Sequence, residues 1–260
     1  MTKFSLKNHI IFITGATSGF GKACARLLYA HGAKLILTGR RGEKLRELQV
    51  ELGADRVHIA ELDVTQKGAV EKIVADLPSA FSPITVLINN AGLALGLELV
   101  PNCSLDDWEH VVDTNIKGIL RCTHAILPTM VANKSGYVIN IGSIAGTYPY
   151  PGGNVYGGTK AFVKQFSLNL RADLFGTPIR VTNIEPGLAE TEFSVVRFKG
   201  DEEKAKSIYA GTEPILAEDI AETVLWCISR PAHININRIE VMPTCQAFSM
   251  FAINRSLLGK

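Results

Sequence analysis

The sequence predicts an α/β protein, a single domain built on a doubly wound, mostly parallel sheet of seven strands with helices on both faces. Short runs of β-branched residues alternate along the chain with longer segments of helical pattern, which is typical of strands joined by crossover helices. Some of the short runs are continuously apolar, such as Ile-Ile-Phe-Ile at residues 10–13 and Val-Leu-Ile at residues 86–88. Strands of this kind are buried on both faces, as a parallel sheet requires.

The apolar runs predict strands at residues 9–14, 34–38, 56–61, 85–89, 137–141, 179–184 and 238–241. The intervals predict helices at residues 19–31, 43–52, 67–77, 104–131, 155–174 and 217–229. Because each helix carries the chain from one strand to the next parallel strand, we expect right-handed βαβ units. No repeat, low-complexity segment or long linker interrupts this order, so one domain spanning residues 1–260 is predicted.

Two segments fall outside this alternation. Residues 187–214 are rich in Gly, Glu, Lys and Phe and follow a strand end at which open α/β sheets bind their ligands. We interpret them as a mobile substrate lid, with a plain surface insertion as the alternative. The tail, residues 242–260, carries many apolar side chains. We expect it at a subunit interface or over the substrate cleft, unless it packs on its own domain.

Composition and charge exclude several classes of function. The net charge of +2 is too small to indicate nucleic acid or a membrane surface as a partner, and no apolar run is long enough to span a bilayer. The first eight residues lack the apolar core of a signal peptide. Five cysteines are scattered without a Cys-x-x-Cys pair, so we expect no metal site, no disulfide framework and a cytoplasmic location.

A glycine-rich turn, Thr-Gly-Ala-Thr-Ser-Gly-Phe-Gly at residues 14–21, follows the first predicted strand and opens a helix. Glycines let the backbone approach a pyrophosphate closely, and a helix N-terminus offers free N–H groups and a partial positive charge. The turn is not a P-loop, because Ala23 stands where Ser or Thr is needed. A dinucleotide site is therefore predicted, with a simple tight turn as the alternative. The predicted contacts come from Gly15, Thr17, Ser18, Gly19, Phe20 and Gly21.

The residues after the second strand distinguish between the nicotinamide dinucleotides. An NAD site has an acidic residue there, which accepts hydrogen bonds from the adenosine ribose, whereas this chain has Arg40 and Arg41. A guanidinium can bind a 2′-phosphate through two hydrogen bonds and can stack on adenine. We therefore predict NADP as the cofactor, and the alternative is a solvated pair of arginines.

Polar residues also follow the third and fourth strands. Asp63, next to Val64, is placed to accept a hydrogen bond from the adenine amino group. The Asn-Asn-Ala-Gly turn at residues 89–92 is placed to line the cofactor and to tie neighbouring strands together. The cofactor-binding candidates of these two turns are Asp63, Val64, Asn89, Ala91 and Gly92.

Tyr156 is followed four residues later by Lys160, and Ser143 lies just after the fifth strand. The spacing puts both long side chains on one helix face, although an exposed pair is the alternative. We expect the tyrosine pKa, near 10 in a free phenol, to be lowered by a nearby ammonium and an oxidised nicotinamide. Tyr156 would then exchange the proton of a hydroxyl or carbonyl group, while Ser143 polarises its oxygen. Lys160 would also hold the nicotinamide ribose.

Asn115 lies in the middle of the predicted helix 104–131, where asparagine is a poor helix former. We interpret it as a residue that bends the helix and holds a water molecule relaying protons to Lys160. The alternative is a tolerated polar residue.

Over essentially its whole length the chain resembles the short-chain dehydrogenases/reductases. The glycine turn, the Asn-Asn-Ala-Gly turn and the residues Asn115, Ser143, Tyr156 and Lys160 match motifs of that family. The resemblance implies a Rossmann fold and a catalytic tetrad formed by these four residues.

The resemblance extends to further positions. It implies that the turn at Pro186 and Gly187, with Thr191 after it, contacts the nicotinamide carboxamide. Residues 150–156, 191–201 and 242–248 are similar to the NADP-dependent 3-hydroxy acid dehydrogenases, a subgroup also described as serine or L-allo-threonine dehydrogenases. This closer likeness implies a homotetramer and a small 3-hydroxy acid as the substrate.

Such an acid carries a carboxylate two carbons from the reacting carbon, and its pocket must neutralise that charge. Arg197, in the predicted lid, is our first candidate for a clamp with two hydrogen bonds, and Lys199 is the second. A solvent-facing arginine is the alternative. Tyr150 is placed either to line the substrate pocket or to pack within its loop.

Two other functions stay open at this point. A reductase of other carbonyls, such as 3-oxoacyl thioesters or xenobiotic ketones, would suit a pocket without a working Arg197. A nucleotide-sensing regulatory protein would keep the fold without turnover. Such a protein would be expected to lose Ser143, Tyr156 or Lys160, and all three are present.

Overall fold

The computed structural model describes residues 5–248 and contains one sheet of seven strands in the order β3-β2-β1-β4-β5-β6-β7. The strands are β1 Ile10–Ile13, β2 Lys34–Gly39, β3 Val57–Glu61, β4 Val86–Asn89, β5 Tyr137–Ile141, β6 Arg180–Pro186 and β7 Arg238–Val241. Every pair of neighbouring strands is parallel. The predicted doubly wound sheet is therefore confirmed. The strand order reverses between β1 and β4, which is the point where such sheets bind ligands.

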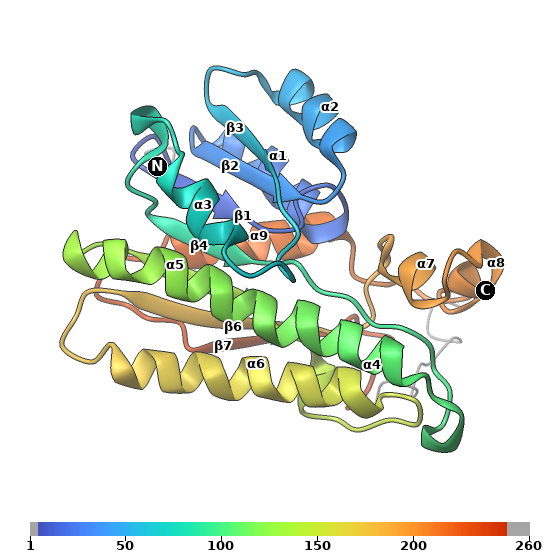
Figure 1. Cartoon of the computed structure of the whole chain (residues 1–260). Helices are drawn as coiled ribbons and strands as arrows, with labels where there is room; N and C mark the ends of the chain where they lie inside the picture. The colour runs from blue at the N-terminus through green and yellow to red at the C-terminus, as the bar shows by residue number, and fades with distance from the viewer. Residues whose placement is uncertain (1–4, 249–260) are drawn as a thin grey trace.

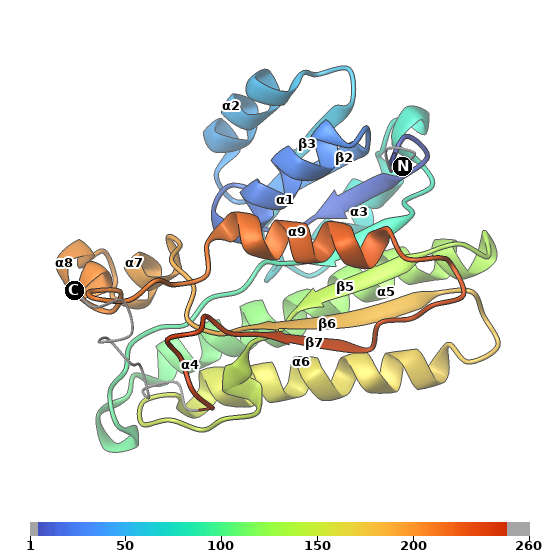
Figure 2. The ribbon, with the colours of Figure 1, turned by 180° about the vertical axis from the view of Figure 1, so that it is seen from behind.

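Helices cover both faces of the sheet. They are α1 Gly19–Ala30, α2 Gly42–Leu52, α3 Ala69–Ala75, α4 Leu105–Val112, α5 Gly118–Ala132, α6 Asn154–Asp173, α7 Phe193–Arg197, α8 Glu202–Ser207 and α9 Ala217–Ile228. Short 3₁₀ turns occupy Ser79–Phe81, Val100–Asn102 and Ile144–Gly146. One face carries α3, α5 and α6 (Figure 1), and the other carries α1, α2 and α9 (Figure 2). Within residues 5–248, no helix has the length and apolar character that crossing a membrane requires.

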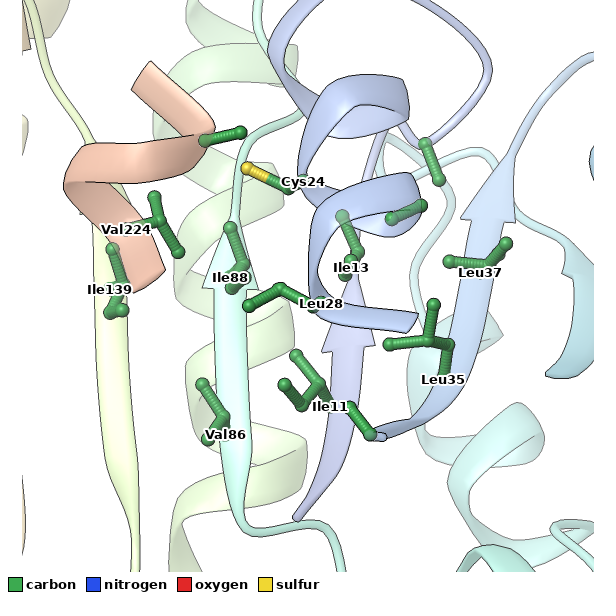
Figure 3. Packing of buried hydrophobic residues seen from close by; sticks show 14 of the residues in the cluster. Ile11, Ile13, Cys24, Leu28, Leu35, Leu37, Val86, Ile88, Ile139 and Val224 are labelled. Atoms are coloured by element: carbon green, nitrogen blue, oxygen red, sulfur yellow. The ribbon is translucent and has the colours of Figure 1, made fainter. Parts of the chain in front are cut away.

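The apolar core forms two clusters, one on each face of the sheet. Because side chains alternate along a strand, Ile11 and Ile13 of β1 belong to one cluster and Phe12 belongs to the other. On the first face, Leu28 of α1 and Val224 of α9 pack over the central strands (Figure 3). The two packed layers fix the strands, and with them the positions of the turns at their carboxyl ends.

The structure differs from the predicted elements in two places. The predicted helix 104–131 is divided by a π-helical turn, Asp113–Lys117, between α4 and α5. In addition, the segment 187–214, for which no helix was predicted, contains α7 and α8. Both are shorter than two turns, so they carry too few residues to show a helical period in the sequence.

The described part of the tail packs back against the segment after β6. Gln246 is buried, and its Oε1 accepts a hydrogen bond of 2.7 Å from the backbone N–H of Leu188. Phe248 is exposed, with its ring 5.7 Å from that of Tyr148. The remaining apolar residues of the predicted tail lie outside the described residues, and these are Met250, Phe251, Ile253, Leu257 and Leu258.

Candidate active site

A cavity of about 480 Å³ opens at the carboxyl ends of the strands. The predicted residues that line it are Gly15, Thr17, Ser18, Gly19, Phe20, Arg40, Arg41, Asp63, Val64, Ala91, Gly92, Ser143, Tyr156, Lys160, Pro186, Gly187, Thr191 and Arg197. They come from the carboxyl ends of six different strands and from the turns and helices that follow these strands. Four other candidates, Gly21, Asn89, Asn115 and Tyr150, do not line it. The fold therefore gathers into one cleft residues that are spread over most of the chain.

The glycine turn is shaped to hold an anion at the start of α1. The capping residue Ser18 makes no side-chain hydrogen bond to the helix, and the first turn contains no acidic residue, so its N–H groups are available to a phosphate. Gly15 and Gly19 have φ values of +65° and +47°, which side-chain-bearing residues rarely adopt. A Cβ on Gly21 would lie 2.4 Å from the carbonyl oxygen of Gly15. Gly21 thus allows close packing beneath the turn.

Two asparagines in the Asn-Asn-Ala-Gly turn have separate structural roles. Asn89 is buried and donates 2.8 Å and 3.3 Å hydrogen bonds to Asn140 and Thr123, so it ties β4 to its neighbours below the cavity. Asn90 lines the cavity, and its Nδ2 donates to the carbonyl oxygens of Thr14 and Gly15 at 2.9 and 3.1 Å. Asn90, which was not among the predicted site residues, therefore supports the glycine turn directly.

Asp63 is held in place by its own turn. Its Oδ1 accepts hydrogen bonds from the backbone N–H and the hydroxyl of Thr65, at 2.9 and 2.7 Å. The loss of water around Asp63 raises the pKa of its carboxyl, but these hydrogen bonds and the charge of Arg40 outweigh that effect and lower it overall. A charged acceptor therefore stands in the cavity wall after β3.

Tyr156 and Lys160 project from the first turns of α6, and the Lys160 Nζ lies 5.8 Å from the centre of the Tyr156 ring. Lys160 is buried, and its Nζ donates a 2.8 Å hydrogen bond to the carbonyl oxygen of Ile141 at the end of β5. Burial lowers the lysine pKa to about 8. Ser143 follows the same strand, and its Oγ accepts a hydrogen bond of 3.1 Å from the N–H of Ala145. The predicted pair is therefore not an exposed one.

The protein groups by themselves raise the pKa of Tyr156, whereas the predicted lowering also counted an oxidised nicotinamide and stays a prediction for the protein with that group bound. The loss of water around the phenol is the largest effect and raises the pKa to about 12. The charge of Arg197 and a hydrogen bond with Ser143 lower it, but by less. The phenol is therefore protonated at neutral pH, the form that can donate a proton to a carbonyl oxygen.

Asn115 lies in the π-helical turn, is buried, and forms hydrogen bonds with protein groups through both ends of its amide. Its Oδ1 accepts a hydrogen bond from the N–H of Leu93 at 2.9 Å, and its Nδ2 donates to the carbonyl of Leu93 at 2.8 Å and to Thr159 Oγ1 at 3.0 Å. Thr159 precedes Lys160 on α6. Asn115 therefore connects the turn after β4 to the helix that carries the lysine.

Arg197 is buried at the end of α7, with 5% of its surface exposed. Its Nη2 donates a 2.7 Å hydrogen bond to the hydroxyl of Tyr150, and its Cζ lies 5.1 Å from the centre of the Tyr156 ring. No carboxylate within residues 5–248 forms an ion pair with it, and its buried Nε has no hydrogen-bond partner there. The alternative of a solvent-facing arginine is thus excluded.

The second clamp candidate lies elsewhere. Lys199 is exposed and forms an ion pair of 2.7 Å with Asp107, outside the cavity lining. The phenol of Tyr150 contacts the guanidinium of Arg197 and does not line the cavity. Tyr150 therefore holds the arginine that faces the cavity.

A doubly wound sheet whose cleft joins a glycine turn to a half-buried tyrosine and a buried lysine defines a class of nucleotide-dependent oxidoreductases. The family model of the short chain dehydrogenases matches residues 9–202. The chain belongs to this family.

Individual relatives cover nearly the whole chain. It is 54% identical over 248 residues to the NADP-dependent 3-hydroxy acid dehydrogenase YdfG of Salmonella typhi, a match covering 95% of this chain and 100% of that one. It is 52% identical to the sulfoacetaldehyde reductase 2 of Chromohalobacter salexigens, covering 95% and 98%. Among solved structures, the closed form of a serine dehydrogenase complexed with NADP+ has a TM-score of 0.90 and 54% identity, covering 91% of this chain and 96% of that one.

Proposed function

We propose that the protein is an NADP-dependent oxidoreductase that transfers a hydride between the nicotinamide and the hydroxyl-bearing carbon of a small 3-hydroxy acid. The observation that carries this proposal is Arg197, a buried cation without a carboxylate partner among residues 5–248, 5.1 Å from the ring of Tyr156. A buried unpaired charge is costly, so a substrate anion is its natural partner. The names of the relatives, a 3-hydroxy acid dehydrogenase and a serine dehydrogenase, support it.

The residues of the cleft fit NADP along its whole length. The start of α1 would hold the pyrophosphate, Arg40 and Arg41 the 2′-phosphate, and Asp63 and Val64 the adenine. Nearer the chemistry, Ala91 and Gly92 would line the middle of the cofactor, Lys160 would hold the nicotinamide ribose, and Pro186, Gly187 and Thr191 would hold the carboxamide. When bound, NADP supplies the hydride donor or acceptor.

The groups that transfer the proton and stabilise the charges are side chains of the protein. In reduction, the neutral phenol of Tyr156 donates its proton to the substrate oxygen, which the Ser143 hydroxyl orients and polarises. In oxidation, Tyr156 first loses its own proton to solvent and then, as the phenolate, receives the hydroxyl proton. Lys160 stabilises the phenolate that forms, because its ammonium lies near the ring. Asn115 acts on the lysine through Thr159 and is a positioning residue.

The anionic group of the substrate would bind to Arg197 through two hydrogen bonds. A carboxylate fits this description, and so does a sulfonate, the group implied by the name of the sulfoacetaldehyde reductase. Reductases of bulky apolar carbonyls would gain nothing from a buried guanidinium at this position. The segment 187–214, which carries Arg197, would serve as the lid of the substrate site.

The proposal predicts that the enzyme prefers small acids and NADP. We expect NADP reduction, followed at 340 nm, with 3-hydroxypropionate, L-serine or L-allo-threonine, and a much lower kcat/KM with 1-propanol. We also expect NAD to be a poorer cofactor. If the uncharged alcohol is as good as the acids, the substrate class is wrong, whereas isethionate as the best alcohol would identify a sulfonate enzyme.

We also infer that the protein is a homotetramer located in the cytoplasm. The tetramer follows from the likeness to the 3-hydroxy acid dehydrogenases, and five free thiols suit a reducing compartment. Light scattering should give a mass about four times the 28.2 kDa of one chain. A mass near 28 kDa would contradict this expectation.

A further inference from the structure

Glu192 lines the same cavity as Arg40 and Arg41. Its Oε2 accepts a 2.8 Å hydrogen bond from Arg41 Nη1, and its Oε1 lies 3.5 Å from Lys44 Nζ. The turn after β2 has no acidic residue of its own. The carboxylate that faces these cations comes from a position 151 residues further along the chain.

Most of the N–H donors of the Arg41 guanidinium already form hydrogen bonds. Its Nε and Nη2 donate to Thr17 Oγ1 at 3.1 and 2.9 Å, while Nη1 donates to Glu192. A guanidinium offers its donors in a fixed planar fork, and a phosphate takes two of them in parallel. Thr17 and Glu192 engage three of the five N–H groups of Arg41, so a 2′-phosphate that binds Arg41 either displaces the Glu192 carboxylate or lies beside it.

Glu192 carries a negative charge at neutral pH. Partial loss of water raises its pKa, but the hydrogen bond from Arg41 and the charges of Arg41 and Lys44 outweigh this and lower it overall. A carboxylate and a phosphate at one guanidinium repel each other, as like charges do. A 2′-phosphate therefore binds Arg41 less tightly while the Glu192 carboxylate is there.

We propose that Glu192 is a specificity-determining residue that competes with the 2′-phosphate of the cofactor for Arg41. This inference rests on the proposed function, which puts the 2′-phosphate at Arg40 and Arg41. Glu192 weakens the binding of a dinucleotide that carries the phosphate and leaves one without it unaffected. The preference for NADP over NAD is therefore smaller than the two arginines would produce without it.

The competition at Arg41 can be tested by measuring the binding of two adenosine nucleotides, without any turnover. Calorimetry on the full chain would compare 2′,5′-ADP, which carries the 2′-phosphate, with 5′-AMP, which lacks it. For Glu192→Gln we expect 2′,5′-ADP to bind about two- to fivefold more tightly, the range of an exposed ion pair, and 5′-AMP to be unchanged. The side chain is 48% exposed, so the variant should fold normally. Glu202→Gln, which removes an exposed partner of Lys206 on the same segment, should change neither affinity.

A double-mutant cycle identifies the shared partner. Arg41→Gln should weaken 2′,5′-ADP binding, and the gain from Glu192→Gln should shrink or vanish in that background because the contested donors are gone. An unchanged or weaker affinity of Glu192→Gln for 2′,5′-ADP would overturn the competition. If the wild type itself binds 2′,5′-ADP no better than 5′-AMP, it is the NADP assignment that fails.

Discussion

Replacing Tyr156 with phenylalanine is expected to lower kcat by about 10²- to 10⁴-fold, the usual contribution of a positioned acid or base. The substitution keeps the aromatic ring, which packs 5.6 Å from the ring of Phe193, and removes only the hydroxyl that exchanges the proton. Binding of NADP should change little, so the loss should appear in kcat. Steady-state kinetics with a preferred acid, and NADP binding measured by fluorescence, separate the two effects.

Tyr148→Phe is the matched control for this prediction. The Tyr148 hydroxyl donates a 3.1 Å hydrogen bond to Glu240 on β7, and the residue does not line the cavity. Its removal should leave kcat within a factor of about two, because the hydroxyl lies outside the cavity and surface substitutions usually change the free energy of unfolding by less than about 0.5 kcal/mol. Undiminished turnover in Tyr156→Phe would show that another group carries the proton and that the mechanism proposed here is wrong.

Replacing Arg197 with glutamine is expected to remove the preference for acids. Truncating one partner of a buried, hydrogen-bonded charge pair costs about 2–5 kcal/mol, which is roughly 30- to 5,000-fold in kcat/KM for the acid. The uncharged alcohol does not use the clamp, so its kcat/KM should fall much less. Arg197→Lys should recover only part of the loss, because an ammonium cannot form the fork of two parallel hydrogen bonds. The measured quantity is the ratio of kcat/KM between 3-hydroxypropionate and 1-propanol.

Lys199→Gln is the comparison that decides between the two predicted clamps. Lys199 lies two residues further on and is exposed, with Asp107 as its partner. Its removal should leave the acid preference unchanged. A loss of preference in Lys199→Gln, with Arg197→Gln unaffected, would reverse the assignment and would mean that the segment binds substrate in a different arrangement.

The regular elements could be predicted because their signals are local. The run Ile-Ile-Phe-Ile marks a strand buried on both faces, and the observed β1 places Phe12 in one core cluster and Ile11 and Ile13 in the other. All seven strands lie where short runs rich in β-branched and apolar residues predicted them. The glycine turn could be predicted for the same reason, because the spacing of its glycines and its place after a strand can be read from residues that are close in the sequence.

Other features depend on charge and water and could not be predicted locally. The expected fall in the Tyr156 pKa rested on the nearby ammonium and an oxidised nicotinamide, whereas among the protein groups the loss of water around the phenol dominates and raises the pKa to about 12. That effect depends on how the segment 187–214 and α6 close around the ring. The different structural roles of Asn89 and Asn90 likewise depend on which side of the turn faces the cavity.

The sequence by itself determined the fold class, the order of the strands along the chain and the candidate residues at the ends of the strands, since each follows from short-range patterns of residue type. Only the tertiary structure decided that Arg197 is buried against Tyr150, 47 residues away, and that Glu192 reaches Arg41 across 151 residues. These contacts join side chains on separate elements. Their geometry is set by the packing of those elements on the sheet, which no local pattern of residues specifies.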